Sequence, residues 1–130
     1  MADHSPLNVL VVEDDVDIAE TLKDFLDGHG YSVSCMASGE AALQDLRPGR
    51  HTDIMLVDFT LSSRMTGVEL LEICAADAAL ARVPVILMTG FPAEHFRAGL
   101  RCPVLTKPFA LGQVLAALTA ATKVEARPTV

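Results

Sequence analysis

Two kinds of hydrophobic pattern alternate along the chain. Short runs rich in β-branched and other apolar residues predict five strands, over Leu7–Val12, Tyr31–Met36, Ile54–Val57, Val83–Met88 and Val104–Leu105. Longer segments with apolar residues at helical spacing predict five helices, over Val16–Asp27, Gly39–Leu46, Gly67–Ala76, a region near Ala93–Leu100, and Leu111–Thr122. Strands that alternate with helices in this way are typical of an α/β fold.

The strands themselves indicate how the sheet is built. Val9–Val12, Ile54–Val57 and Val83–Met88 are nearly continuous apolar runs rather than alternations of apolar and polar residues. Such strands are buried on both faces, as in a parallel sheet that helices cover on each side. Five strands alternating with five helices therefore predict a doubly wound sandwich with the flavodoxin-like strand order 2-1-3-4-5.

Composition limits the size and class of the molecule. The 130 residues, 51% of them hydrophobic, suffice for one domain over residues 1–130, with a core from about 7 to 122 and a flexible tail over 123–130. The net charge is −7 and the ten Lys and Arg residues form no stripe, so direct binding to nucleic acid is not expected. No uncharged stretch reaches the roughly 20 residues that a membrane span requires, and no basic segment marks a signal peptide.

Three cysteines, Cys35, Cys74 and Cys102, are present. Their number is odd and their spacing fits no metal motif. We expect them to be buried free thiols in a reducing compartment, which favours a cytoplasmic protein.

Polar residues gather where the predicted strands end. Glu13 and Asp14 follow the first strand, Asp58 follows the third, Thr89 ends the fourth and Lys107 follows the fifth. The carboxyl ends of parallel strands line one edge of an open sheet, where ligands bind. The predicted order makes the first and third strands neighbours, about 4.8 Å apart. We therefore expect the three carboxylates to be crowded together.

Crowded carboxylates repel one another strongly unless a cation joins them. An all-oxygen acidic site suits Mg²⁺, which prefers octahedral geometry and keeps several waters. With the cation present, Asp58 stays ionised and can act as a nucleophile toward phosphorus. Phosphoryl transfer depends on positioning and charge neutralisation. Mg²⁺, the Lys107 ammonium and the Thr89 hydroxyl would each take one phosphoryl oxygen.

Each of these residues also has a structural explanation when it is taken alone. The acidic run Glu13–Asp15 complements the dipole of the helix that follows it. Thr89 can cap a turn, and Lys107 can be an ordinary surface lysine. Four separate strand ends that carry the residue types of one chemical site are harder to explain in this way, so the combined pattern favours a phosphorylation site.

Four stretches of the sequence resemble the receiver domain of two-component response regulators. They are Val9–Asp15 (VLVVEDD), Asp53–Asp58 (DIMLVD), Pro84–Gly90 (PVILMTG) and Leu105–Phe109 (LTKPF). Each stretch is modest alone, but together and in this order they are highly specific. The resemblance covers about residues 7–122, nearly the whole chain, and implies a signalling domain.

The resemblance implies a role for the residues at the strand ends. Asp58 is similar to the phosphoacceptor, which receives a phosphoryl group from a phosphohistidine on a sensor histidine kinase or a phosphotransfer protein. Thr89 is similar to the switch hydroxyl that moves toward this group, and Lys107 to the lysine that holds it. The Lys107–Pro108 bond is similar to one that is cis in the family, which costs little before proline.

The metal implied by the resemblance is Mg²⁺. Asp14 is similar to the direct ligand, Glu13 to its acidic partner that often acts through water, and the Thr60 carbonyl to the backbone ligand. Asp58 completes the set. Phosphorylation would then shift the protein toward an arrangement that an unknown downstream protein prefers.

Three features depart from the family pattern. Ser62 stands where members often have proline, in a loop one residue longer before Gly67. Val104 stands where the family usually has a rotating aromatic residue. Seventeen residues separate Thr89 from Lys107, so the helix near residues 93–100 is short. We expect another form of switch movement, and a weak homodimer remains open.

Two other functions are compatible with the fold. An interaction module that has lost phosphorylation is disfavoured by the complete set of Asp14, Asp58, Thr89 and Lys107. A flavodoxin-like cofactor binder needs a phosphate-cradling loop after the first strand, where Glu13–Asp15 would repel a phosphate. We therefore expect a receiver that promotes only its own phosphorylation and dephosphorylation, not an enzyme with a separate substrate.

Overall fold

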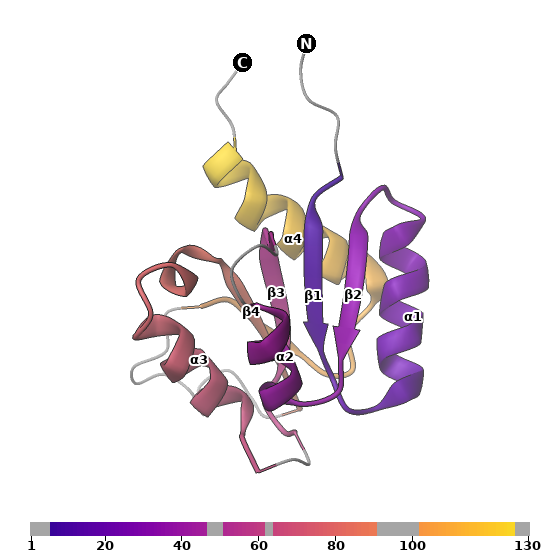
Figure 1. Cartoon of the computed structure of the whole chain (residues 1–130). Coiled ribbons are helices and arrows are strands. Elements are labelled where there is room, and N and C mark those ends of the chain that lie inside the picture. The colour runs from indigo at the N-terminus through magenta and orange to yellow at the C-terminus, as the bar shows by residue number, and fades with distance from the viewer. Residues whose placement is uncertain (1–5, 47–50, 62–63, 91–101, 127–130) are drawn as a thin grey trace.

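The computed structural model describes residues 6–46, 51–61, 64–90 and 102–126. In these ranges the chain forms five strands, four α-helices and one short 3-10 helix (Figure 1). The strands are β1 (Asn8–Val12), β2 (Ser32–Met36), β3 (Ile54–Asp58), β4 (Val85–Thr89) and β5 (Val104–Thr106). The α-helices are α1 (Val16–Asp27), α2 (Gly39–Asp45), α3 (Gly67–Ala75) and α4 (Leu111–Ala126), and the 3-10 helix is η1 (Leu80–Arg82).

The five strands form one parallel sheet in the order β2-β1-β3-β4-β5. This confirms the predicted doubly wound fold. In the register of the central strands, Val12 lies opposite Val57 and Asp58 lies opposite Met88. The residues that follow β1 and β3 therefore emerge side by side at the same edge of the sheet.

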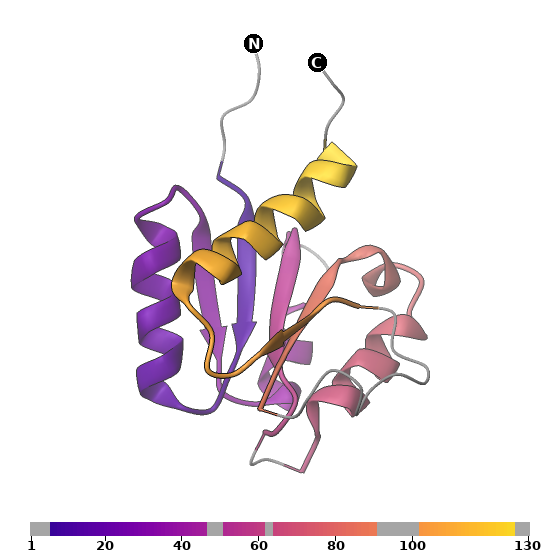
Figure 2. The same ribbon diagram turned by 180° about the vertical axis from the view of Figure 1, so that it is seen from behind.

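Helices cover both faces of the sheet, with α1 and α4 on one side and α2 and α3 on the other (Figures 1 and 2). Successive strand residues point to opposite faces, so each strand contributes to two separate cores. Val9 and Val11 pack with Leu22 of α1 and Leu118 of α4. Leu10 and Val12 pack instead with buried residues of the other two helices, Ala42, Leu70 and Cys74. All five residues of β3 are buried, as expected for a central strand.

Side-chain caps fix where the helices start. The Asp15 carboxylate accepts a hydrogen bond from the Ile18 backbone N–H at 3.1 Å, and the Ser38 hydroxyl accepts one from Ala41 N–H at 3.0 Å. At α3, Thr66 and Glu69 form a reciprocal capping box. The α1 cap, Asp15, follows Asp14 directly and so fixes the turn that carries the acidic residues after β1. The α3 cap, Thr66, lies at the far end of the loop that follows Asp58.

The sequence and the structure differ at several boundaries. Strands β3 and β4 each extend one residue further than predicted, to Asp58 and Thr89, and α4 extends to Ala126. The 3-10 helix was not predicted. The helix expected near residues 93–100 lies outside the described residues, as does the end of the predicted tail. The Lys107–Pro108 peptide bond is cis, as the resemblance implied.

The cysteines only partly match the expectation of burial. All three are free; Cys74 is buried, whereas Cys35 and Cys102 are half-buried. Burial raises the pKa of each thiol above its usual value, which disfavours the reactive thiolate. Within the described ranges, none of the helices is both long and apolar enough to cross a membrane.

Candidate functional site

Three carboxylates meet at the carboxyl edge of the sheet. Glu13 and Asp14 leave the end of β1, and Asp58 is the last residue of the neighbouring strand β3. One carboxylate oxygen from each of the three residues lies within 4.8 Å of the others. The strand order thus produces the crowding that the sequence predicted.

Burial makes this cluster electrostatically costly. Glu13 is 3% exposed and Asp58 is 5% exposed, while Asp14 is half-buried. Loss of hydration raises the pKa of Glu13 from 4.5 to about 7, and the neighbouring charge of Asp58 acts in the same direction. Hydrogen bonds from the Asp15 backbone and from Lys107 oppose this rise. Glu13 therefore holds its proton to a higher pH than an ordinary glutamate does.

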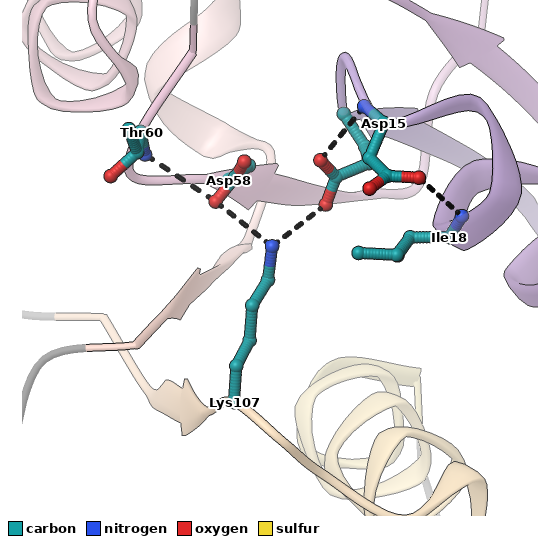
Figure 3. Close-up of polar contacts among 6 residues, drawn as sticks. Asp15, Ile18, Asp58, Thr60 and Lys107 are labelled. Carbon is teal, nitrogen blue, oxygen red and sulfur yellow. Dashed lines mark hydrogen bonds and ion pairs between the residues drawn. The ribbon is translucent and has the colours of Figure 1, made fainter.

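Lys107 places an ammonium group between two of the carboxylates. It follows β5, and its backbone N–H donates to the Thr89 carbonyl at 2.6 Å. Its Nζ lies 3.1 Å from Glu13 Oε1 and 3.3 Å from Asp58 Oδ1 (Figure 3). Burial alone would lower the pKa of Lys107, but the hydrogen bond to Glu13 and the charge of Asp58 outweigh it and raise the pKa.

The loop after β3 holds the Asp58 side chain from the other direction. The Thr60 backbone N–H donates to Asp58 Oδ1 at 3.3 Å, and Figure 3 shows Thr60 and Lys107 reaching the same carboxylate from opposite sides. Thr60 itself is exposed. A single Asp58 oxygen thus receives two hydrogen bonds, which fixes the orientation of the carboxylate.

Gly67 supports this loop in a way that the sequence did not reveal. Its N–H donates to the Phe59 carbonyl at 3.2 Å. A Cβ atom at Gly67 would overlap the Asp58 carbonyl oxygen and lie only 3.0 Å from Phe59 Cα. The start of α3 therefore packs directly against the backbone of Asp58. A glycine at the first position of a predicted helix was the only signal in the sequence.

Thr89 lies at the same edge, at the end of β4. It is 1% exposed, and in the β4–β5 register it lies opposite Thr106, directly before Lys107. Val104, at the position where an aromatic residue was expected, is half-buried and lies opposite Leu87. The edge thus combines Glu13, Asp14, Asp58, Thr89 and Lys107, as the sequence predicted.

The donor chemistry of this edge fits a hard divalent cation. When all three carboxylates are ionised, they carry two more negative charges than the single ammonium offsets. Mg²⁺ binds through one or two carboxylates together with waters, and here three carboxylate oxygens lie close enough to share one ion. The Thr60 backbone borders this region, because its N–H donates to the Asp58 carboxylate.

Comparison with known proteins identifies the class. The sequence matches the family described as response regulator receiver domain over residues 9–119. It is 36% identical over 89 residues to the transcriptional regulatory protein ZraR of Escherichia coli O157:H7, in an alignment that covers 68% of this chain and 19% of ZraR. The chain spans 19% to 34% of the length of the first curated relatives that it matches.

Solved structures agree with this match. The non-phosphorylated HemR receiver domain from Leptospira biflexa is 26% identical, with a TM-score of 0.76 over 95% of this chain and 99% of that one. A second neighbour is the receiver domain of a sensor histidine kinase from Pseudomonas aeruginosa PAO1, which has a magnesium ion in its active-site cleft. It is 24% identical, and the match covers 88% of this chain and 96% of that chain with a TM-score of 0.76.

The chain belongs to the receiver domain family of two-component response regulators. Phosphorylation on an aspartate and Mg²⁺ binding at an acidic pocket are general properties of this family.

Proposed function

We propose that this chain is an active receiver, which accepts a phosphoryl group on Asp58 in the presence of Mg²⁺ and then signals to a partner protein. The observation that carries the proposal is the convergence of three carboxylates opposite one fixed ammonium group at the end of β3. Burying these charges together costs free energy of desolvation, and nothing offsets this cost in a domain that serves only as a passive interaction module.

The acceptor in this proposal is a carboxylate oxygen of Asp58. It forms a bond to the phosphorus of a phosphohistidine on a sensor histidine kinase or phosphotransfer protein. The N–P bond breaks, and the imidazole leaves with the electron pair. Lys107 lies beside this carboxylate and would accompany the transferred group as a counter-charge, and the Thr89 hydroxyl would donate to a phosphoryl oxygen.

Asp14 and Asp58 would hold the magnesium ion directly, with the Thr60 carbonyl as a backbone ligand and Glu13 acting through water. Bound Mg²⁺ supplies positive charge that offsets both the carboxylates and the incoming phosphoryl oxygens. The magnesium seen in the receiver domain from Pseudomonas aeruginosa supports this choice of metal.

The donor protein would dock beside α1. A groove of about 290 Å³ lies between α1 and the start of α4, with Ile18, Leu22, Phe109 and Leu111 among its lining residues. Asp15, which caps α1, follows Asp14 directly. An apolar docking surface this close to the acidic cluster suits a partner that must present a side chain to Asp58.

Signal output would follow from movement at the ends of β4 and β5. Thr89 and Lys107 are joined through the backbone hydrogen bond between these strands, so a shift of Thr89 toward the phosphoryl group would also displace β5. With Val104 in place of an aromatic residue, this movement would involve the strands rather than a ring rotation. The functional setting we propose is the cytoplasm, where such kinases present their phosphohistidines.

The test is modification of Asp58 itself. Intact-mass measurement after treatment with acetyl phosphate and Mg²⁺, and amide NMR spectra with beryllofluoride and Mg²⁺, should show a response in the native protein and none in Asp58→Asn. Asp24→Asn, at an exposed position of α1, is the matched control and should respond like the native protein. Equal responses in Asp58→Asn and the native protein would remove Asp58 as the acceptor.

A further inference from the structure

A second groove lies on the opposite side of the sheet, between α2 and α3. Its volume is about 520 Å³, and it is lined by Glu40, Arg64, Met65, Glu69, Glu72, Ile73 and Ala76. This size is within the range of sites that accept several side chains or a small ligand. None of these residues belongs to the acidic cluster at the end of β3.

The floor of the groove is apolar and accessible. Ile73 is 42% exposed, and Val16 on α1 is the other large hydrophobic residue exposed to this degree among the described residues. Met65 lies against Gly39, where an added Cβ atom would be 2.7 Å from the Met65 sulfur. This close packing holds a methionine, a side chain that adapts to varied partners, at one wall of the groove.

The rim of the groove is acidic. Glu40, Glu69 and Glu72 are exposed around it, and Arg64 is the one basic residue among the described residues that line it. One Glu69 oxygen accepts the capping hydrogen bond from Thr66 N–H at 2.9 Å. An apolar floor inside a mainly negative rim is complementary to an amphipathic segment that carries Lys or Arg beside its apolar side chains.

We propose that the α2–α3 groove docks a basic amphipathic helix of a partner protein. The apolar face of that helix would cover Ile73 and Met65, and its basic residues would approach Glu40 and Glu72. A groove between two helices suits this mode of recognition, in which one apolar stripe of the incoming helix is buried. The proposal goes beyond phosphorylation of Asp58, and unmodified protein suffices to test it.

The test uses a synthetic amphipathic helix of leucine and lysine as the probe, with NMR titration as the readout. Saturable shifts of amide signals should concentrate in α2 and α3. The same peptide with glutamate in place of lysine should bind at least about tenfold more weakly. No saturable shift in α2 and α3, or equal binding of the acidic peptide, would overturn the proposal.

Two pairs of matched variants separate the groove from the overall negative charge of the protein. Ile73→Ser should weaken binding by roughly tenfold, as expected when the exposed part of one isoleucine is no longer buried, whereas Val16→Ser should leave it unchanged. Glu72→Lys should weaken binding by at least about threefold at low salt. Glu20→Lys, an equal charge change at an exposed site on α1, should have a smaller effect. Equal effects within either pair would refute the groove as the docking site.

Discussion

The close contact between Gly67 and the backbone of Asp58 leaves no room for a side chain at position 67. In Gly67→Ala, the new methyl group would overlap the Asp58 carbonyl oxygen and lie 3.0 Å from Phe59 Cα, well inside the 3.5–4.0 Å at which carbon atoms attract one another. Relief requires α3 or the end of β3 to shift. Overpacking of this kind typically destabilises a protein by about 1–3 kcal/mol.

An opposing effect comes from helix propensity. Alanine stabilises a helix by up to about 1 kcal/mol relative to glycine. The clash involves backbone atoms that cannot rotate away, so we expect it to outweigh the propensity gain and to leave Gly67→Ala less stable by about 1–2 kcal/mol. Gly112→Ala in α4 is the matched control, because nothing lies within 4 Å of the new methyl group there. That variant should be more stable than the native protein by up to about 1 kcal/mol.

Urea denaturation of the three proteins measures both effects. Gly67→Ala should also lose beryllofluoride affinity, since the displaced backbone carries the Asp58 carboxylate, while Gly112→Ala should keep it. If both variants gained stability equally, the close packing of α3 against Asp58 would be wrong. If Gly67→Ala lost stability but bound beryllofluoride normally, the close packing of α3 would be supported. Its role in positioning the Asp58 carboxylate would then be refuted.

Two further predictions concern the electrostatics of the site. The pKa of Glu13 is about 7 in the folded protein against an ordinary 4.5, so the folded state holds a proton that the unfolded chain releases between these values. Metal-free protein should therefore lose stability as pH rises from about 4.5 through 7, and this group contributes at most about 1.4 kcal/mol per pH unit to the fall in unfolding free energy. In Glu13→Gln this contribution should be absent when the unfolding free energy is measured by urea denaturation at several pH values. An unchanged pH dependence in that variant would contradict a raised pKa at Glu13. Added Mg²⁺ should raise the melting temperature of the native protein, and chelation should reverse the rise. The melting temperature of Asp14→Ala should change little when Mg²⁺ is added. An equal rise in both proteins would exclude Asp14 as a ligand.

Much of the fold could be predicted because the relevant signals are local. Continuous apolar runs such as Ile54–Val57 identified buried parallel strands, and the spacing of apolar residues in Val16–Asp27 gave the bounds of α1 as observed. The convergence of Glu13, Asp14 and Asp58 followed from strand order alone, because neighbouring parallel strands bring their ends together.

Other features depend on contacts between distant segments, which hydrophobic periodicity does not encode. The bridge from Lys107 to Glu13 joins residues 94 positions apart, and only the folded geometry shows that this ammonium contacts both carboxylates. The approach of Gly67 to Asp58 has the same origin. The 3-10 helix at Leu80–Arg82 has only three residues, too few to show a hydrophobic period. The partial exposure of Cys35 and Cys102 depends on how the edges of the sheet are covered.

The division of the helices between the two faces of the sheet has a consequence for how partners could be combined. The groove beside α1 and the groove between α2 and α3 lie on opposite sides of a layer of backbone. Segments bound in the two grooves would contact different residues, so neither would displace the other by competing for the same surface. The sheet that separates the two grooves has β3, the strand that carries Asp58, at its centre, so Asp58 lies between the two docking surfaces.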